Sequence, residues 1–219
     1  VLLLKKIFSK LPESLEGIKP TLLYPVLGVF IMGVLMLFVF NPIIGVINDA
    51  LAHLLNSMGS VSKVILGIVL GGMMAIDMGG PINKAAYVFG TMSITSGNYD
   101  IMAAVMVGGM VPPIGIALAT TFFKNRFSKS ERQSGITNYV MGLAFITEGA
   151  IPFAAADPLH VIPATAVGAA VAGALSMVFG CTLMAPHGGI FVFPVVGNWP
   201  MYLVALAAGS VITMFMLAL

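Results

Sequence analysis

The chain has 219 residues, of which 59% are hydrophobic and only 8% are charged, and its formal net charge at pH 7 is +2. This composition, with a mean hydropathy of +1.05, excludes an ordinary water-soluble domain and indicates an integral protein of the lipid bilayer. The basic residues stand at the ends of apolar segments and form no basic face with base-reading groups, which excludes a nucleic-acid partner.

The N-terminal region predicts a basic segment on the cytoplasmic side, followed by a membrane span. Residues 5–19 contain four lysines, and positive charge beside an apolar segment marks the cytoplasmic face. Residues 22–47 are apolar apart from Asn41 and exceed the roughly 20 residues that a spanning helix needs. Residues 48–63 are then an external connection. Since the chain opens on Val1 with charges behind the first apolar residues, it does not resemble a signal peptide and is expected to be a fragment.

An interrupted apolar stretch follows at residues 64–95. Its centre reads DMGGPINK, where Asp77, Asn83 and Lys84 stand beside glycine and proline. Non-helical backbone at membrane depth requires surrounding protein or a water-filled cavity, so we expect a re-entrant hairpin or a broken helix here. The run GGP predicts a tight turn followed by a helix that starts near Ile82.

Residues 101–123 are the second predicted span, and the basic residues between 124 and 132 place the loop behind it on the cytoplasmic side. An even number of crossings must therefore separate this loop from segment 5–19. The two spans 22–47 and 101–123 already supply two crossings. Because segment 64–95 is too short for two further spans of about 20 residues each, we expect it to enter and leave by the outer face.

The second interrupted stretch, residues 135–156, leads into the motif ITEGAIPFAAADP. Glu148 stands just before Gly149 and Pro152, which predicts that a helix ends here and that its backbone opens. An ionised carboxylate at membrane depth is costly unless it faces a wet cavity or a partner, so Glu148 is the leading functional candidate. The alternative is a structural carboxylate that caps a neighbouring helix or pairs with Lys84.

Residues 161–180 and 201–219 are the third and fourth predicted spans. Asp157, directly before a proline, stands ahead of the third span, where an N-cap and a ligand role remain alternatives. Trp199 and Tyr202 are expected as interfacial anchors of the fourth span. The third span also carries small residues that suit close helix packing: Gly168, Ala169, Ala172, Gly173 and Ala174.

The third interrupted stretch, residues 182–196, contains the run APHGG. Its histidine, His187, can hydrogen-bond a substrate or relay a proton, or it can be satisfied by backbone at the tip of a hairpin. Three scattered histidines and a single cysteine, Cys181, provide neither the spacing of a metal site nor a disulfide. We therefore expect no metal and no cofactor.

Asn83 and Lys84 lie in the first turn of the helix predicted near Ile82. Free backbone N–H groups at a helix start, with a lysine beside them, suit the oxygens of a polar substrate or of a phosphorylated product. The alternative makes Lys84 a structural counter-ion of Asp77 or Glu148.

Four motifs in order along the chain, MAIDMGGPINKAAY, GMVPPIGIALAT, FITEGAIPFAAADP and APHGGIFVFP, closely resemble the fructose-type membrane permease domain, enzyme IIC, of the bacterial phosphoenolpyruvate-dependent sugar phosphotransferase system. The resemblance covers nearly the whole chain, and four long motifs are far more specific than one short pattern. It implies an all-α, polytopic protein of the bacterial inner membrane that forms homodimers and has two re-entrant hairpins. Since the family's domain carries further helices in front, residues 1–219 are expected to be its larger, C-terminal part.

The function that the resemblance implies is group translocation. Fructose or a related hexose crosses inside the permease and is phosphorylated by a phosphocysteine on a partner IIB domain. Glu148 is similar to the family's sugar-binding glutamate and would orient or deprotonate the attacking hydroxyl, although Ala144 stands where the family pattern has glycine. Asn83 and Lys84 correspond to the polar tip of the other hairpin. The full predicted binding set is Glu148, Asn83, Lys84, Asp77, His187 and Asp157.

Without phospho-carrier domains, the chain alone is not expected to catalyse phosphorylation. The alternative function is a secondary transporter in which Glu148 and Asp77 carry protons or cations without any phosphoryl transfer. Dependence on a proton gradient, in place of a phospho-donor, would distinguish that transporter from a permease of the phosphotransferase system.

Overall fold

The computed structural model describes residues 17–40, 42 and 60–219. Of the predicted basic segment 5–19, all but the last three residues lie outside the described residues, as does most of the predicted connection 48–63. The chain divides into two units, Val1–Leu54 and Leu55–Leu219, which are described separately.

The described part of the first unit is one helix that is long and apolar enough to cross a membrane, Lys19–Phe40. It consists of the α-helix α2 (Tyr24–Leu35) with a π-helical turn at each end, Lys19–Leu23 and Met36–Phe40. This helix confirms the predicted first span up to Phe40, while residues 43–47 of that prediction lie outside the described part.

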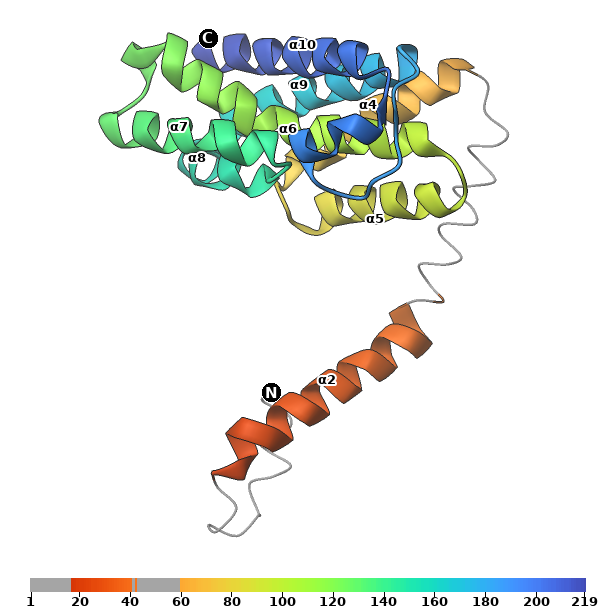
Figure 1. Cartoon of the computed structure of the whole chain (residues 1–219). Helices are drawn as coiled ribbons and strands as arrows, with labels where there is room; N and C mark the ends of the chain where they lie inside the picture. The colour runs from red at the N-terminus through yellow and green to blue at the C-terminus, as the bar shows by residue number, and fades with distance from the viewer. Residues whose placement is uncertain (1–16, 41, 43–59) are drawn as a thin grey trace. The chain divides into compact units, whose positions relative to one another are not determined.

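The second unit contains three long apolar helices, α6 (Tyr99–Phe122), α9 (Pro158–Val178) and α10 (Trp199–Ala218), each able to cross a membrane by length and composition. They confirm the second, third and fourth predicted spans within a few residues at each end. Helix α6 is the central element, because it packs against α9 and α10 and is almost wholly buried (Figure 1).

The first interrupted stretch is a pair of helices, α4 (Ser60–Ile76) and α5 (Pro81–Thr95), joined by a tight turn. The turn forms where the sequence predicted it, because Gly79 adopts φ +110°, a conformation that side chains disfavour, and Pro81 then begins the new helix. The direction from which this hairpin enters the membrane stays a prediction.

The second interrupted stretch is a broken helix. Helix α7 (Lys129–Leu143) starts at a capping box formed by Ser128 and Glu131 and is joined at its start to α6 by the 3₁₀ turn η5 (Lys124–Arg126). After α7 the chain passes through the 3₁₀ turn η6 (Thr147–Ala150) into the short helix α8 (Ile151–Ala156).

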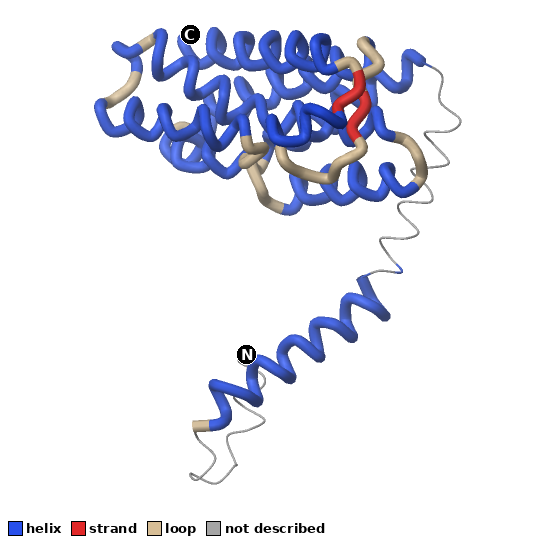
Figure 2. Tube along the Cα trace, viewed as in Figure 1, coloured by secondary structure: helices blue, strands red, loops and turns tan. Residues whose placement is uncertain are grey.

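The third interrupted stretch contains no α-helix. Strands β1 (Thr182–Leu183) and β2 (Val196–Gly197) pair antiparallel, with Thr182 opposite Gly197 and Leu183 opposite Val196. The pair closes a loop that contains the 3₁₀ segment η7 (Gly189–Val195), and Figure 2 shows the two strands in red beside the helices. An α-helix through Gly188 and Gly189 is disfavoured because they adopt φ values of +133° and +56°.

Small residues allow the long helices to approach closely, as the small-residue pattern of the third span predicted. A Cβ built on Gly67 would lie 2.5 Å from the Gly173 carbonyl oxygen, and one built on Gly209 would lie 2.5 Å from the Gly168 oxygen. Helix α9 is therefore packed nearly backbone to backbone against α4 on one side and α10 on the other.

The interfacial role predicted for Tyr202 is wrong. Its side chain is completely buried and its hydroxyl lies 3.7 Å from the Met110 sulfur on α6. The physical reason is that α10 packs on α6, so the face of α10 that carries Tyr202 points inward, whereas Trp199 remains exposed.

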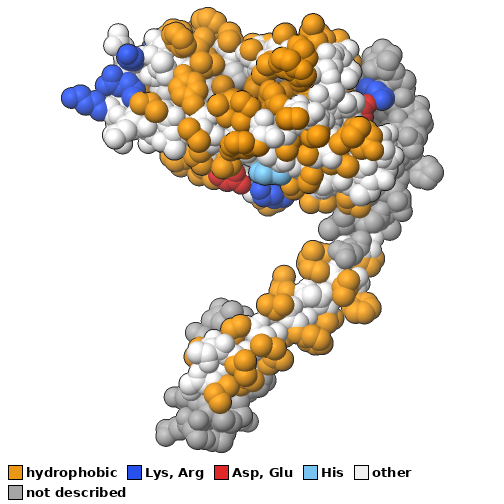
Figure 3. Space-filling view, viewed as in Figure 1, with side chains coloured by type: hydrophobic (Ala, Val, Ile, Leu, Met, Phe, Trp, Pro, Cys, Tyr) orange, Lys and Arg blue, Asp and Glu red, His pale blue; other side chains and the backbone are white. Residues whose placement is uncertain are grey.

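Hydrophobic side chains are spread over the visible face of the second unit. Figure 3 shows lysine and arginine side chains gathered at the end where α6 passes into α7, and hydrophobic side chains in patches across the face, with a few charged side chains and a histidine at its lower edge. That distribution fits a surface that faces lipid between polar ends.

Candidate functional site

A cavity of about 570 Å³ lies where the three interrupted stretches meet. Its volume falls within the range of small-molecule sites, roughly 300–1,000 Å³. Residues from the α4–α5 hairpin, from the break between α7 and α8 and from the β1–β2 loop line it: Met74, Asn83, Lys84, Tyr87, Phe145, Ile146, Thr147, Glu148 and His187.

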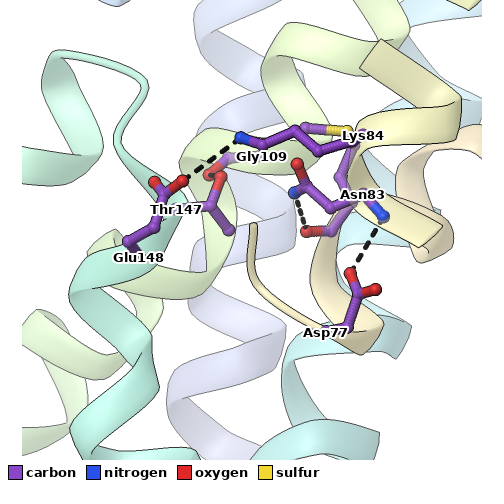
Figure 4. A network of polar contacts seen from close by, with 7 residues as sticks. Asp77, Asn83, Lys84, Gly109, Thr147 and Glu148 are labelled. Atoms are coloured by element: carbon purple, nitrogen blue, oxygen red, sulfur yellow. Dashed lines mark hydrogen bonds and ion pairs between the residues drawn. The ribbon is translucent and has the colours of Figure 1, made fainter. Parts of the chain in front are cut away.

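An ion pair spans the cavity between two of these stretches. The Lys84 Nζ atom lies 3.3 Å from Glu148 Oε1, and Figure 4 shows the lysine of α5 reaching across to the carboxylate of η6. The two side chains are 56% and 44% exposed, so solvent competes for them and the pair contributes little to stability. Both groups therefore remain open to a polar ligand.

Asp77 and Asn83 organise the turn beneath this pair. The Asp77 carboxylate accepts hydrogen bonds from the backbone N–H groups of Ile82 (2.6 Å) and Asn83 (2.9 Å), at the positive end of α5. The Asn83 amide, only 2% exposed, donates to the Met74 carbonyl oxygen at 2.7 Å. Asn83 borders the cavity, but Asp77 is not among its lining residues.

Two close contacts set the position of Glu148. The Thr147 hydroxyl donates to the Gly109 carbonyl oxygen of α6 at 2.9 Å, which anchors the turn next to the carboxylate (Figure 4). A Cβ built on Gly79 would lie 2.6 Å from Glu148 Oε1. The carboxylate therefore rests on the glycine turn of the α4–α5 hairpin, and no larger residue fits there without displacing it.

His187 is part of an aromatic wall. Its ring centroid lies 4.9 Å from that of Phe145 and 6.0 Å from that of Tyr87, and the latter two are 6.2 Å apart. These three rings come from three different segments of the chain. They give the cavity an apolar side next to the Lys84–Glu148 pair.

Asp157 lies outside this cavity and is the N-cap of α9. Its carboxylate accepts from the His160 backbone N–H at 3.4 Å and lies 2.8 Å from the His160 ring nitrogen Nδ1. The hydrogen bond from the His160 side chain lowers the pKa of the Asp157 carboxyl below its ordinary value. The two residues line a separate cavity of about 250 Å³ near Arg126 and Glu131. The structure shows the N-cap, and the ligand role of Asp157 stays a prediction.

The structure thus brings Glu148, Lys84, Asn83 and His187 together around one cavity. Sequence reasoning missed three of their neighbours, Tyr87, Phe145 and Thr147. Tyr87 stands three residues after Lys84, a spacing that puts both on one face of a helix, and Thr147 is inside the quoted motif. Phe145 is the first residue of the motif FITEGAIPFAAADP, and its φ of +63° is a conformation that nothing in the local sequence signals.

Long apolar helices around a polar cavity built from interrupted segments define a polytopic α-helical membrane protein with the site architecture of a transporter. The family described as "Phosphotransferase system, EIIC" matches residues 1–168, and the chain belongs to this family. With its apolar helices, it is a multi-pass protein of the cell's inner membrane.

Named relatives are similar over all or nearly all of the chain. The "PTS system fructose-specific EIIABC component" of Bacillus subtilis (strain 168) is 56% identical over the whole chain, which covers 34% of that protein. The "Fructose permease IIC component" of Bacillus amyloliquefaciens is also 56% identical over the whole chain, which covers 72% of it. The "PTS system fructose-specific EIIB'BC component" of Escherichia coli (strain K12) is 46% identical over 93% of the chain and 37% of its own length.

The chain therefore spans about a third of the multi-component relatives, EIIABC and EIIB'BC, and 72% of the separate IIC component. No solved structure matches it.

Proposed function

We propose that this chain is part of the permease of a fructose phosphotransferase system. It binds fructose in the cavity between the α4–α5 hairpin and η6, and carries the sugar across the membrane as a IIB phosphocysteine phosphorylates it. The observation that carries the proposal is the half-exposed Lys84–Glu148 pair inside a cavity of sugar-binding size. The fructose-specific names of relatives that match the full chain support the choice of sugar.

The cavity offers complementary groups to a sugar. The Glu148 carboxylate has two oxygens, each able to accept a hydroxyl hydrogen bond, and the Lys84 ammonium donates to a hydroxyl or ring oxygen. The wall of Tyr87, Phe145 and His187 can pack against the C–H groups of the ring and exclude water from that side. A sugar bound in this way would replace the direct Lys84–Glu148 contact by bonds to itself.

Phosphoryl transfer then requires one nucleophile and one proton acceptor. The oxygen of a sugar hydroxyl attacks the phosphorus of the IIB phosphocysteine, so an O–P bond forms while the S–P bond breaks. The cysteine sulfur leaves with the bonding electron pair as a thiolate, and the hydroxyl proton passes to Glu148. Positioning this hydroxyl and accepting its proton are the contributions of the chain, since the phosphoryl group belongs to the partner.

The deciding experiment compares Glu148→Gln with the wild type in the full-length permease, expressed in cells that lack their own fructose system. Gln keeps the size of the side chain but loses the negative charge and the proton acceptor. We expect the variant to insert normally and to lose both fructose binding and fructose-phosphate formation. Asp157→Asn, which changes a carboxylate outside the cavity, is the matched control and should accumulate sugar phosphate like the wild type.

Two outcomes would contradict the proposal. Normal uptake by Glu148→Gln would remove that residue from the site. Accumulation of free sugar that needs no phospho-IIB and collapses with the proton gradient would establish the secondary transporter instead.

We also infer that the permease works as a homodimer in contact with lipid. Large apolar side chains are exposed on the described helices of the second unit, for example Phe122 and Phe215, and such a surface is stable only against lipid or another subunit. Native mass spectrometry of the full-length permease in nanodiscs should find two copies. A fully active monomer would contradict this inference.

A further inference from the structure

The buried face of α7 consists of two glycines and one asparagine, Gly135, Gly142 and Asn138. Both glycines lie against α6, because a Cβ on Gly135 would collide with Thr120 and one on Gly142 with Ile114. Asn138 stands between them on the same face and is the only one of the three with a hydrogen-bonding side chain. The close packing of α7 on α6 therefore depends on the two glycines.

Asn138 is buried without a partner for its amide nitrogen. The residue is 2% exposed, and among the described residues no group accepts a hydrogen bond from Nδ2. Burying an amide donor without a partner is unfavourable, and an apolar side chain of similar size would avoid that cost. A native structure that retains such a group calls for a reason other than packing.

The asparagine lies directly behind the turn that carries Glu148. A Cβ built on Gly149 would lie 2.5 Å from Asn138 Oδ1, so the side chain touches the backbone next to the carboxylate. On its other side the turn is held by the bond from Thr147 to the Gly109 carbonyl oxygen. Glu148 is thus the exposed residue of a turn held between α6 and α7.

We propose that Asn138 is a positioning residue for Glu148. Its side chain packs through Oδ1 against Gly149 and so restrains the η6 turn that carries Glu148. The Glu148 carboxylate is thereby held where both of its oxygens can accept hydrogen bonds from hydroxyl groups of the ligand. The identity of the ligand as fructose rests on the function proposed above, whereas the restraint of the turn does not.

The test replaces Asn138 by Leu, which keeps the branching at Cγ but replaces the amide by two methyl groups, in the full-length permease. Asn138→Ala, which removes the amide without adding bulk, is the second variant. The matched control is Ser210→Ala, because Ser210 on α10 is also buried with no hydrogen-bond partner for its hydroxyl within the described part of the chain, but lies outside the cavity. The measurements are the melting temperature, and the KM and kcat of fructose phosphorylation with excess phospho-IIB.

For both Asn138 variants we expect KM for fructose to rise about tenfold, which corresponds to about 1.4 kcal/mol. We expect kcat to remain unchanged and the melting temperature of Asn138→Leu to stay level or rise. Ser210→Ala should leave KM and kcat unchanged. An unchanged KM in the Asn138 variants would overturn the proposal, as would a KM increase accompanied by a lower melting temperature in both, which would assign Asn138 to folding.

A second readout requires no sugar. With Cys181 replaced by Ser and Glu148→Cys introduced, the rate at which a water-soluble maleimide alkylates position 148 reports how firmly the turn is held. We expect Asn138→Leu to change this rate several-fold and Ser210→Ala to leave it unchanged. Equal rates would overturn the role of Asn138 whatever the substrate is. If the wild type fails to phosphorylate fructose while the rates differ, only the proposed function fails.

Discussion

Gly79, in the turn between α4 and α5, lies against the Glu148 side chain of the η6 turn. It adopts φ +110° in the turn before α5, and Glu148 occupies the space that a side chain would need. Gly97 adopts φ +78° with nothing within 4 Å of a built Cβ. An alanine at position 97 therefore tests backbone strain alone, whereas an alanine at position 79 tests backbone strain together with displacement of the Glu148 carboxylate.

We predict that Gly79→Ala and Gly97→Ala each cost about 1–2 kcal/mol of stability from the left-handed backbone. Only Gly79→Ala should also abolish fructose phosphorylation, because it pushes Glu148 out of position. Melting temperature and KM, measured on both variants, check this. Equal effects of the two variants on KM would show that the carboxylate does not depend on Gly79.

Lys84 offers a second test at the scale of a single residue. Its ion pair with Glu148 is half exposed, so Lys84→Gln should change the free energy of unfolding by less than about 1 kcal/mol. If the ammonium also binds the sugar, KM for fructose should rise clearly while the melting temperature stays constant. A lower melting temperature with an unchanged KM would identify Lys84 as a structural counter-ion only.

At the scale of the elements, the close crossing of α4 with α9 depends on the glycine of α4 that faces α9. A Cβ on Gly71 would collide with the Ala169 carbonyl, whereas a Cβ on the adjacent Gly72 would meet its nearest atom at 3.8 Å, an ordinary contact. Gly71→Ala should therefore destabilise the protein by about 1–3 kcal/mol. Gly72→Ala should be neutral or stabilising, since alanine favours a helix by about 0.5–1 kcal/mol. Thermal unfolding in one detergent compares the two, and equal melting temperatures would contradict the close crossing.

The cap of α9 is tested at the same scale. Asp157→Ala removes the acceptor of the His160 backbone N–H and should lower the melting temperature without changing KM for fructose. Because the native pKa of Asp157 lies below its ordinary value of 3.8, its contribution to stability is complete above that pH. The contribution is lost as the pH falls through the lowered native pKa. A raised KM for fructose in Asp157→Ala at neutral pH would instead support the ligand role of Asp157.

For the whole molecule, the central prediction is the orientation of α6 across the membrane. Ser96 and Ser130 are exposed residues on either side of α6, and a single crossing by this helix must place them on opposite faces of the membrane. With Cys181 replaced by Ser, a membrane-impermeant maleimide should label Ser96→Cys in intact cells and Ser130→Cys only in inverted vesicles. Labelling of both from one side would contradict the crossing and the argument that segment 64–95 enters from outside.

Elements of this molecule were predictable where hydropathy and backbone chemistry act locally. A long apolar run must be helical in lipid, because each backbone group needs an internal partner, so the spans of α6, α9 and α10 were found within a few residues. Glycine and proline located the turn before α5 and the opening at Glu148. They did not reveal that the loop around His187 forms strands and 3₁₀ turns, since strand pairing between Thr182 and Gly197 depends on two segments that are not adjacent.

By itself, the sequence determined the membrane class, the long helices, the breaks between them and the two charged residues that the structure places at one cavity, Lys84 and Glu148. These follow from the cost of burying charge and unpaired backbone in lipid, which each residue carries wherever it lies. The tertiary structure alone decided that Asp77 caps α5, that Tyr202 is buried, that Phe145 joins the cavity and that Asn138 lies behind Glu148. Such roles depend on which faces of distant helices meet, and that is set by packing.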